Sequence, residues 1–131
     1  MIIYSVTAKI SSKQLANLIA HSKSQRPTND LGRLTRMIRN ANLLYSAWDD
    51  DRLVGVVRGF SDEVTCCYLS ELVVRDDYPQ LEISRKLINK IHRELGSGIS
   101  LVSAVIPDSL ATDEKMGFEQ IDSGFQLPRE Y

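Results

Sequence analysis

The residues between Tyr68 and Lys86 are predicted to form a strand, a loop and a helix, a combination that can bind an anion. The strand ends at Val74, the loop runs through residues 75–80, and the helix is expected to begin near Glu82. A helix start exposes unpaired backbone NH groups and the positive end of the helix dipole, so it can hold a pyrophosphate without any particular side chain. On spacing alone, however, such a unit is more often scaffold than site.

The elements before this unit are predicted from their apolar periodicity and from their cap and turn residues. They are, in order, a short strand (2–6), a helix capped by Ser11 or Ser12, a second helix (31–40), and two strands (43–48 and 53–60) joined by a turn at 49–52. Because the turn is acidic and short, it has the composition of an antiparallel hairpin.

From the middle of the chain onwards, strands alternate with helices. The pattern predicts a long strand (65–74), a helix (82–95), a strand (100–106), a short helix and at least one more strand within 118–127. A strand, helix, strand crossover joins parallel strands. The expected fold class is therefore α/β of the α+β kind, with a mixed, mostly antiparallel central sheet, one βαβ crossover and flanking helices.

Length and charge exclude several classes of protein. A chain of 131 residues is in the single-domain range, so we expect one domain over residues 1–131. Its 16 basic residues nearly balance 17 acidic ones, which argues against nucleic acid or an anionic membrane as a partner. The first residues lack a signal-peptide pattern and no segment has the roughly 18 apolar residues of a membrane span, so a cytoplasmic location is expected.

The cysteines and histidines do not predict a metal site. Cys66 and Cys67 are adjacent, and in a strand their side chains point to opposite faces, which favours reduced thiols. His21 and His92 are far apart in sequence and neither lies near the cysteines. A zinc site is therefore not expected.

Three separated segments together resemble the GNAT acetyltransferase superfamily. The run Tyr68-Leu-Ser-Glu-Leu-Val-Val74, followed by Asp77-Tyr78 and then Ile83-Ser-Arg-Lys-Leu-Ile88, resembles its acetyl-CoA-binding motif. The run Arg52-Leu-Val-Gly-Val-Val57 resembles the central hairpin strand, and Glu114-Lys-Met-Gly-Phe-Glu119 resembles the late EKxGF signature. The resemblance covers nearly the whole chain and implies acetyl-CoA as a cosubstrate, an amine as acceptor and no metal.

The phosphate loop departs from the family pattern of Gln or Arg, two residues, Gly, one residue, then Gly or Ala. Aligning the helix places Pro79, Glu82 and Ser84 at these positions. A register that starts at Gln80 would misplace the helix and is rejected. Glycine at the middle position allows a close backbone approach to phosphate, whereas a carboxylate stabilises the helix start and repels a pyrophosphate.

The resemblance implies a cofactor site and a base. The residues that it assigns to acetyl-CoA are Leu72, Val73, Val74, Gln80, Leu81, Glu82, Ile83, Ser84, Arg85, Lys86 and Asp113. The backbone NH of Val73 or Val74 would polarise the thioester carbonyl. Glu71 would deprotonate the amine directly or through a water, although a strand carboxylate satisfied by a hydrogen bond or an ion pair explains it equally well.

The sequence leaves two points open: which group protonates the departing thiolate, and which residues bind the acceptor. Family members commonly have a tyrosine acid where this sequence has Asp113, and an aspartate is ordinarily ionised at neutral pH and cannot donate a proton. Residues 26–33 could form the acceptor wall or be an ordinary connection. The leading hypothesis is an N-acetyltransferase, and the competing one is a non-catalytic module that acts as an acyl-CoA sensor or a homodimer.

Overall fold

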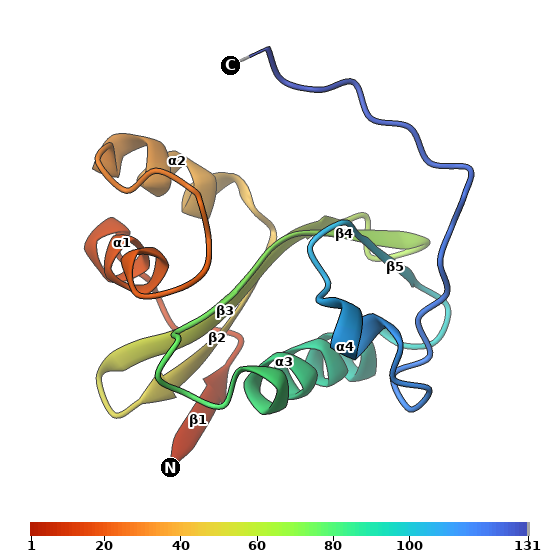
Figure 1. The fold of residues 1–131 in the computed structure, drawn as a ribbon, viewed down its shortest axis with the longest axis horizontal. Coiled ribbons are helices and arrows are strands. Elements are labelled where there is room, and N and C mark those ends of the chain that lie inside the picture. The colour runs from red at the N-terminus through yellow and green to blue at the C-terminus, as the bar shows by residue number, and fades with distance from the viewer. Residues whose placement is uncertain (131) are drawn as a thin grey trace.

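The computed structural model describes residues 1–130, whose strands form one sheet with helices on both faces (Figure 1). The strands lie across the sheet in chain order: β1 (Ile2–Ser5), β2 (Leu43–Asp49), β3 (Arg52–Ser61), β4 (Cys66–Val74) and β5 (Ser100–Ser103). The pairs β1–β2, β2–β3 and β3–β4 are antiparallel, and β4–β5 is parallel. The predicted mixed sheet with a βαβ crossover is confirmed.

Two helices cover one face of the sheet. In α1 (Ser12–Ala20), Ser11 and Gln14 form a reciprocal capping box. Of the two residues predicted to cap this helix, Ser11 is therefore the one that does so. In α2 (Leu31–Asn40), the Asp30 side chain accepts a hydrogen bond from the Arg33 backbone NH at 3.0 Å. Apolar residues of both helices pack on β3 and β4 in one buried cluster.

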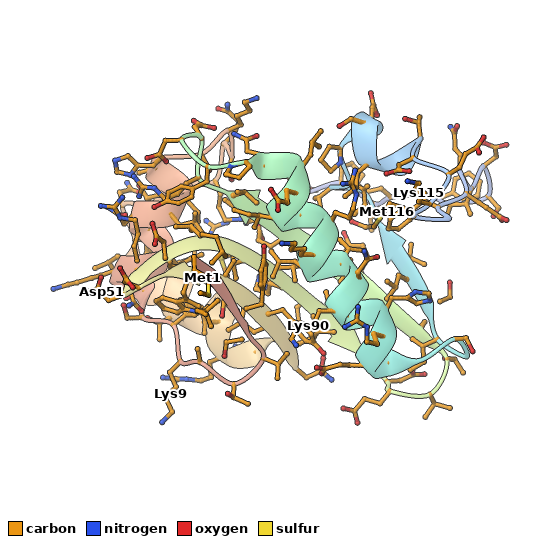
Figure 2. The ribbon with its side chains drawn as sticks, turned by 90° about the horizontal axis from the view of Figure 1, so that it is seen from below. Met1, Lys9, Asp51, Lys90, Lys115 and Met116 are labelled. Atoms are coloured by element: carbon orange, nitrogen blue, oxygen red, sulfur yellow. The ribbon has the colours of Figure 1, made fainter. Side chains whose placement is uncertain are left out.

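The other face is covered by α3 (Gln80–Leu95), which crosses the strands diagonally in Figure 2, and by the short α4 (Asp108–Ala111). The buried stripe of α3 includes Ile83, Leu87 and Ile91. Gly55 of β3 lies beneath this helix, and a Cβ there would come within 3.0 Å of Ile83 Cγ2. The glycine therefore lets α3 approach the sheet closely, which fixes the position of the first turn of the helix.

Two predicted boundaries are wrong by a few residues. The helix expected from Glu82 begins at Gln80, because Pro79 already has the extended backbone of an N-cap residue. The strand expected to reach residue 106 ends at Ser103. The Ser103 hydroxyl donates to the Leu69 carbonyl and accepts the Val105 backbone NH, which turns the chain away from the sheet.

The strand predicted within residues 118–127 does not form, and the prediction was wrong. This tail has no regular secondary structure, and Phe125 and Leu127 are each 98% exposed. A strand is stabilised by a paired neighbour and by burial of one face. Residues 118–127 have no paired neighbour, and only Phe118 among them is partly buried. The outer edge of β5 consequently has no strand paired to it in the part of the chain that the structure describes.

Both cysteines are free thiols at the start of β4, and their side chains point to opposite faces as predicted. Cys66 is exposed and Cys67 is buried. Burial is the main cause that raises the pKa of the Cys67 thiol, and the charge of the neighbouring Cys66 adds to it. This side chain is therefore a packing residue rather than a nucleophile. Within residues 1–130, no helix has the length and apolar character that crossing a bilayer requires.

Candidate functional site

A cleft of about 380 Å³ lies between the end of β4, the start of α3 and two connections. Seven of the predicted site residues line it: Glu71, Leu72, Val73, Val74, Gln80, Leu81 and Ser84. The remaining wall comes from residues 22–24 between α1 and α2 and from Val105 and Pro107 after β5. The volume is in the range of small-molecule sites.

The cleft exists because β4 and β5 separate. They pair only from Cys66–Ser100 to Leu69–Ser103, so the last five residues of β4 have no partner on this side. At the same point β4 carries an extra residue, since Arg58 pairs with Glu71 and Gly59 pairs with Leu69. Such a bulge locally bends a strand.

The backbone groups that face the open edge can be assigned from the pairing. The Arg75 NH donates to the Val54 carbonyl at 2.9 Å, toward β3. Because successive residues direct their backbone groups to opposite edges of a strand, Val73 also faces β3. Leu72 and Val74 therefore present their NH and carbonyl groups to the cleft, which leaves Val74 rather than Val73 as the amide available to a ligand.

The start of α3 supplies further backbone donors. No side chain caps the helix, because its N-cap residue is Pro79. The first residues, Gln80, Leu81 and Glu82, have no intrahelical partners for their NH groups, whereas Ile83 already donates to the Pro79 carbonyl at 3.1 Å. These amides and the positive end of the dipole suit a phosphate.

The Glu82 carboxylate is turned away from the cleft. It pairs with Lys86, four residues later, at 3.2 Å, and both side chains are more than half exposed. Lys86 also lies over the Tyr4 ring at 5.9 Å. Neither Glu82 nor Lys86 lines the cleft, so the acid sits on the outer face of the first turn and its charge is partly offset.

Three other predicted residues also lie outside the cleft. The Ile83 side chain is 1% exposed and belongs to the core. Arg85 donates to Asp113 at 3.1 Å, and Asp113 also accepts the Lys115 backbone NH at 3.0 Å. Residue 113 follows α4 and precedes a turn rather than starting a helix.

The loop between β4 and α3 is fixed by charged side chains. Arg75 is buried and donates to Asn17 of α1 at 3.0 Å and to Asp77 at 3.2 Å. Desolvation acts to raise the pKa of Asp77, but the hydrogen bond and charge of Arg75 outweigh it and leave this pKa below its ordinary value. The hydroxyl of Tyr78 donates to Asp49, which raises the pKa of Tyr78. These contacts hold the first turn of α3 in place.

Glu71 is 6% exposed and is held by two arginines. Its Oε1 accepts from Arg26 Nη2 at 2.8 Å and from Arg58 Nη2 at 2.9 Å, and its Oε2 accepts from Arg26 Nε at 3.0 Å. Arg58 also donates to Ser70 at 3.2 Å and lies over the Phe60 ring at 5.6 Å. The carboxylate at the cleft is thus ion-paired on both oxygens.

Arg58 is a site residue that sequence analysis missed. It stands inside the apolar run of β3, where it is 7% exposed. A buried arginine requires an acidic partner, so its position between valines and Phe60 was a readable signal for an ion pair, whereas the choice of Glu71 as partner depends on the register between β3 and β4. The cleft-lining residues Ser22, Lys23 and Ser24 carry no such signal, because only the fold brings their connection to β4.

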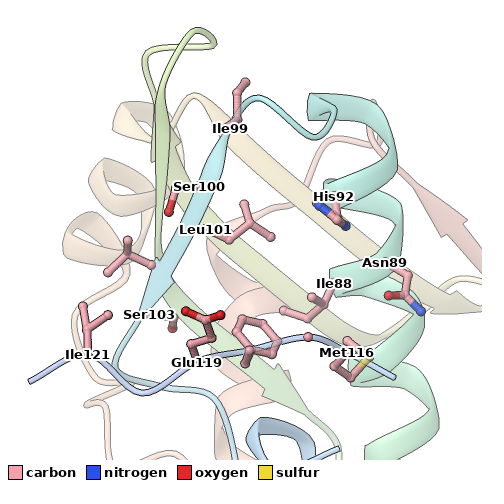
Figure 3. Close-up of a pocket in the computed structure, with 13 residues that line it drawn as sticks. Ile88, Asn89, His92, Ile99, Ser100, Leu101, Ser103, Met116, Glu119 and Ile121 are labelled. Carbon is pink, nitrogen blue, oxygen red and sulfur yellow. The ribbon is translucent and has the colours of Figure 1, made fainter. Parts of the chain in front are cut away.

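A second hollow of about 340 Å³ lies between α3, β5 and the tail (Figure 3). Its apolar lining includes Ile88, Leu101 and Phe118, and the polar side chains of His92 and Glu119 also line it. It contains no residue of the predicted site. Within residues 1–130, no group of three or more His, Cys, Asp or Glu side chains is placed to hold a metal ion.

Comparison with known proteins bears on both fold and family. A family model described as "Acetyltransferase (GNAT) domain" matches residues 8–127. A GNAT family acetyltransferase from Streptococcus pneumoniae has a TM-score of 0.73 at 18% identity, with 99% of this chain and 100% of that chain covered. No curated protein matches the chain.

Two further solved structures carry more specific descriptions. A ribosomal-protein-alanine N-acetyltransferase from Brucella melitensis has a TM-score of 0.69 at 16% identity, with 98% of this chain and 99% of that chain covered. An aminoglycoside N-acetyltransferase in complex with CoA has a TM-score of 0.68 at 14% identity, with coverages of 100% and 96%. At these identities the likeness shows the fold.

Proposed function

The chain belongs to the GNAT acetyltransferase family, and on that premise we propose that it transfers an acetyl group from acetyl-CoA to a primary amine. The observation that carries this function is the meeting of two sets of free backbone groups in one cleft. The unpaired edge of β4 and the uncapped start of α3 both border the same hollow of about 380 Å³.

Each end of the cleft has a distinct task in this function. The amides of Gln80 and Leu81 bind the pyrophosphate, helped by the positive charge of Lys23, which also lines the cleft. The backbone NH and carbonyl groups of Leu72 and Val74 form hydrogen bonds with the pantetheine arm, which lies along β4 in the way that an added strand would. The Val74 NH then polarises the thioester carbonyl, as an oxyanion donor does.

Glu71 is the proposed base for the acceptor amine. It lies three residues before Val74, about 10 Å along the strand. The amine nitrogen attacks the thioester carbon, the carbon–sulfur bond breaks, and Glu71 accepts a proton from nitrogen. No tyrosine or cysteine is among the cleft-lining residues that the structure describes, so the CoA thiolate takes its proton from water.

Binding of the cosubstrate is tested by thermal shift with acetyl-CoA and with free CoA. A ligand that binds only the native state raises the melting temperature, by about 2.7 kcal/mol of stabilisation at a concentration of 100 Kd. Wild type should be stabilised by both. Val105→Trp narrows the cleft and should abolish the shift, whereas Val102→Trp, equally exposed but in the other hollow, should keep it.

Turnover is tested by thiol release with a panel of primary amines. Wild type should release CoA with at least one amine, and Glu71→Gln should lower kcat by about 100-fold or more, as expected for loss of a general base. Absence of a thermal shift in wild type, or retention of it in Val105→Trp, would remove the acetyl-CoA site from this cleft.

A second candidate function is acyl-CoA binding without turnover. It is favoured by the ion pairs that already occupy both oxygens of Glu71. A clear thermal shift with acetyl-CoA, together with no thiol release from any amine, would select this function.

A further inference from the structure

The contact between Arg26 and Glu71 differs in kind from the contact between Arg58 and Glu71. Arg58 extends from the middle of the sheet, with a side chain only 9% exposed, and is also held by Ser70. Arg26 comes from the connection between α1 and α2, and its side chain is 24% exposed. A rotation of the Arg26 side chain therefore returns its guanidinium to water, whereas Arg58 has no such route.

The backbone hydrogen bonds that the structure gives between Ser22 and Arg26 are short-range. The Arg26 NH donates to Ser24 Oγ at 3.2 Å, and the Ser24 NH donates to Ser22 Oγ at 3.1 Å. The carbonyl of His21, at the other end of this stretch, accepts from the Asp76 NH at 2.8 Å. The connection is thus anchored beside the loop preceding α3, while the Arg26 side chain reaches the sheet through Glu71.

The charges at this place favour an exchange of cations. Two guanidinium groups share one carboxylate, so the cluster carries one positive charge. With the Arg26 side chain in water, the remaining Arg58–Glu71 pair is neutral, and a second cation bound at Glu71 restores the single positive charge that the cluster carries in the structure. A primary ammonium is a compact cation with three donors, and it can make the bonds to both carboxylate oxygens that Arg26 makes.

On the premise of the acetyltransferase function proposed above, we infer that Arg26 occupies the subsite of the acceptor ammonium and that the acceptor binds by displacing it. The acceptors are then primary alkylammonium compounds. The carbon chain next to the ammonium is unbranched, so that it fits between residues 22–24 and β4 on its way to Glu71. A neutral compound of the same shape cannot displace Arg26, because it offers no charge to the carboxylate. Arg26 is in this way a specificity-determining residue.

The same exchange explains how the product leaves. The bound ammonium first gives one proton to Glu71, which releases it to water, and the resulting amine attacks the thioester carbon. A C–N bond forms as the C–S bond breaks, and the second proton from nitrogen reaches the CoA thiolate through water, so the products are an uncharged amide, free CoA thiol and one released proton. The amide has lost the charge that held it on Glu71. Arg26 then pairs again with the Glu71 carboxylate, and the uncharged amide is released from the cleft.

The exchange is tested by binding, without acetyl-CoA and without turnover. The probe is n-butylammonium, with 1-butanol as the neutral compound of equal size, titrated into labelled protein while the amide signals around Glu71 are followed by NMR. Arg26→Ala should bind n-butylammonium at least ten-fold more tightly than wild type and should bind 1-butanol unchanged. The double variant Arg26→Ala, Glu71→Gln should lose the gain.

The matched control is Arg39→Ala, which removes an arginine from the last turn of α2 and should bind as wild type does. If Arg26→Ala does not fold, Arg26→Gln keeps the side-chain stem and should give the same gain. No gain in the folded variant, or an equal gain for 1-butanol, would overturn the displacement. Such a result leaves thiol release by wild type intact, whereas absent thiol release with a normal gain refutes the acetyltransferase function alone.

Discussion

Replacing Glu71 by leucine should lower the free energy of unfolding more than replacing Arg58 by methionine. Glu71→Leu leaves the Arg58 guanidinium buried with Ser70 as its remaining hydrogen-bond partner, and the Arg58 Nε has no hydrogen-bond partner even in the native protein. Removing one member of a buried ion pair costs about 3–5 kcal/mol. That loss is a large part of the about 5–15 kcal/mol that stabilises a domain.

The loss should be smaller for Arg58→Met, because Arg26 keeps its bonds of 2.8 and 3.0 Å to the carboxylate. The main loss is the charge-assisted hydrogen bond to Glu71, worth about 1.5–3 kcal/mol, and the weaker contacts of Arg58 with Ser70 and with the Phe60 ring disappear with it. The double variant leaves no buried charge at this place, so it should be no less stable than Glu71→Leu alone. The expected difference between the two single variants is therefore about 1.5–2 kcal/mol.

Urea unfolding followed by circular dichroism measures these free energies, and equal m-values across the variants are the check that the denatured state is unchanged. Wild type, both single variants and the double variant complete a thermodynamic cycle. If Arg58→Met cost as much as Glu71→Leu, Arg26 would not hold the carboxylate in solution, and the view that Glu71 keeps a partner without Arg58 would be refuted.

Three further changes have direct outcomes. Gly59→Ala puts a Cβ 2.5 Å from the Tyr68 carbonyl and should cost about 1–3 kcal/mol in urea unfolding, whereas Gly98→Ala meets no atom within 4 Å and should be neutral or stabilising. Asp62 has its pKa lowered by hydrogen bonds from the Thr65 side chain and from the backbone of residues 64–66, so it stabilises the native protein at neutral pH. The stability difference between wild type and Asp62→Asn should therefore shrink as the pH falls below the ordinary aspartate value of 3.8 in a pH series of unfolding curves. Deleting residues 122–131 should change the unfolding free energy by less than about 1 kcal/mol, because Phe125 and Leu127 are each 98% exposed; a larger loss would mean that the tail packs on the domain.

The elements whose sequence signals are local could be predicted from the sequence. The capping box at Ser11, the apolar stripe of α3 and the acidic hairpin turn each depend on residues within a few positions of one another. The failed strand within residues 118–127 shows the opposite case. Its residues suit a strand, but strand formation depends on a partner and on a buried face, which neighbouring residues do not reveal.

The candidate site divides in the same way. The direction of the Glu82 side chain was readable, because a glutamate four residues before a lysine favours a pair on the outer face of a helix. The choice of Val74 over Val73 was not readable, because it depends on the register between β3 and β4. Arg26 meets Glu71 across 45 positions of sequence, and only the packing of α1 and α2 on the sheet brings them together.

The two adjacent cysteines at the start of β4 point to opposite faces, so they give the protein a single reactive position for chemical labelling. A maleimide dye should react with exposed Cys66 and spare buried Cys67. This position lies at the opposite end of a nine-residue strand from Val74, about 26 Å away. A fluorophore there would report on tumbling and on ligand-induced changes of the whole domain without touching the amides that receive the cosubstrate.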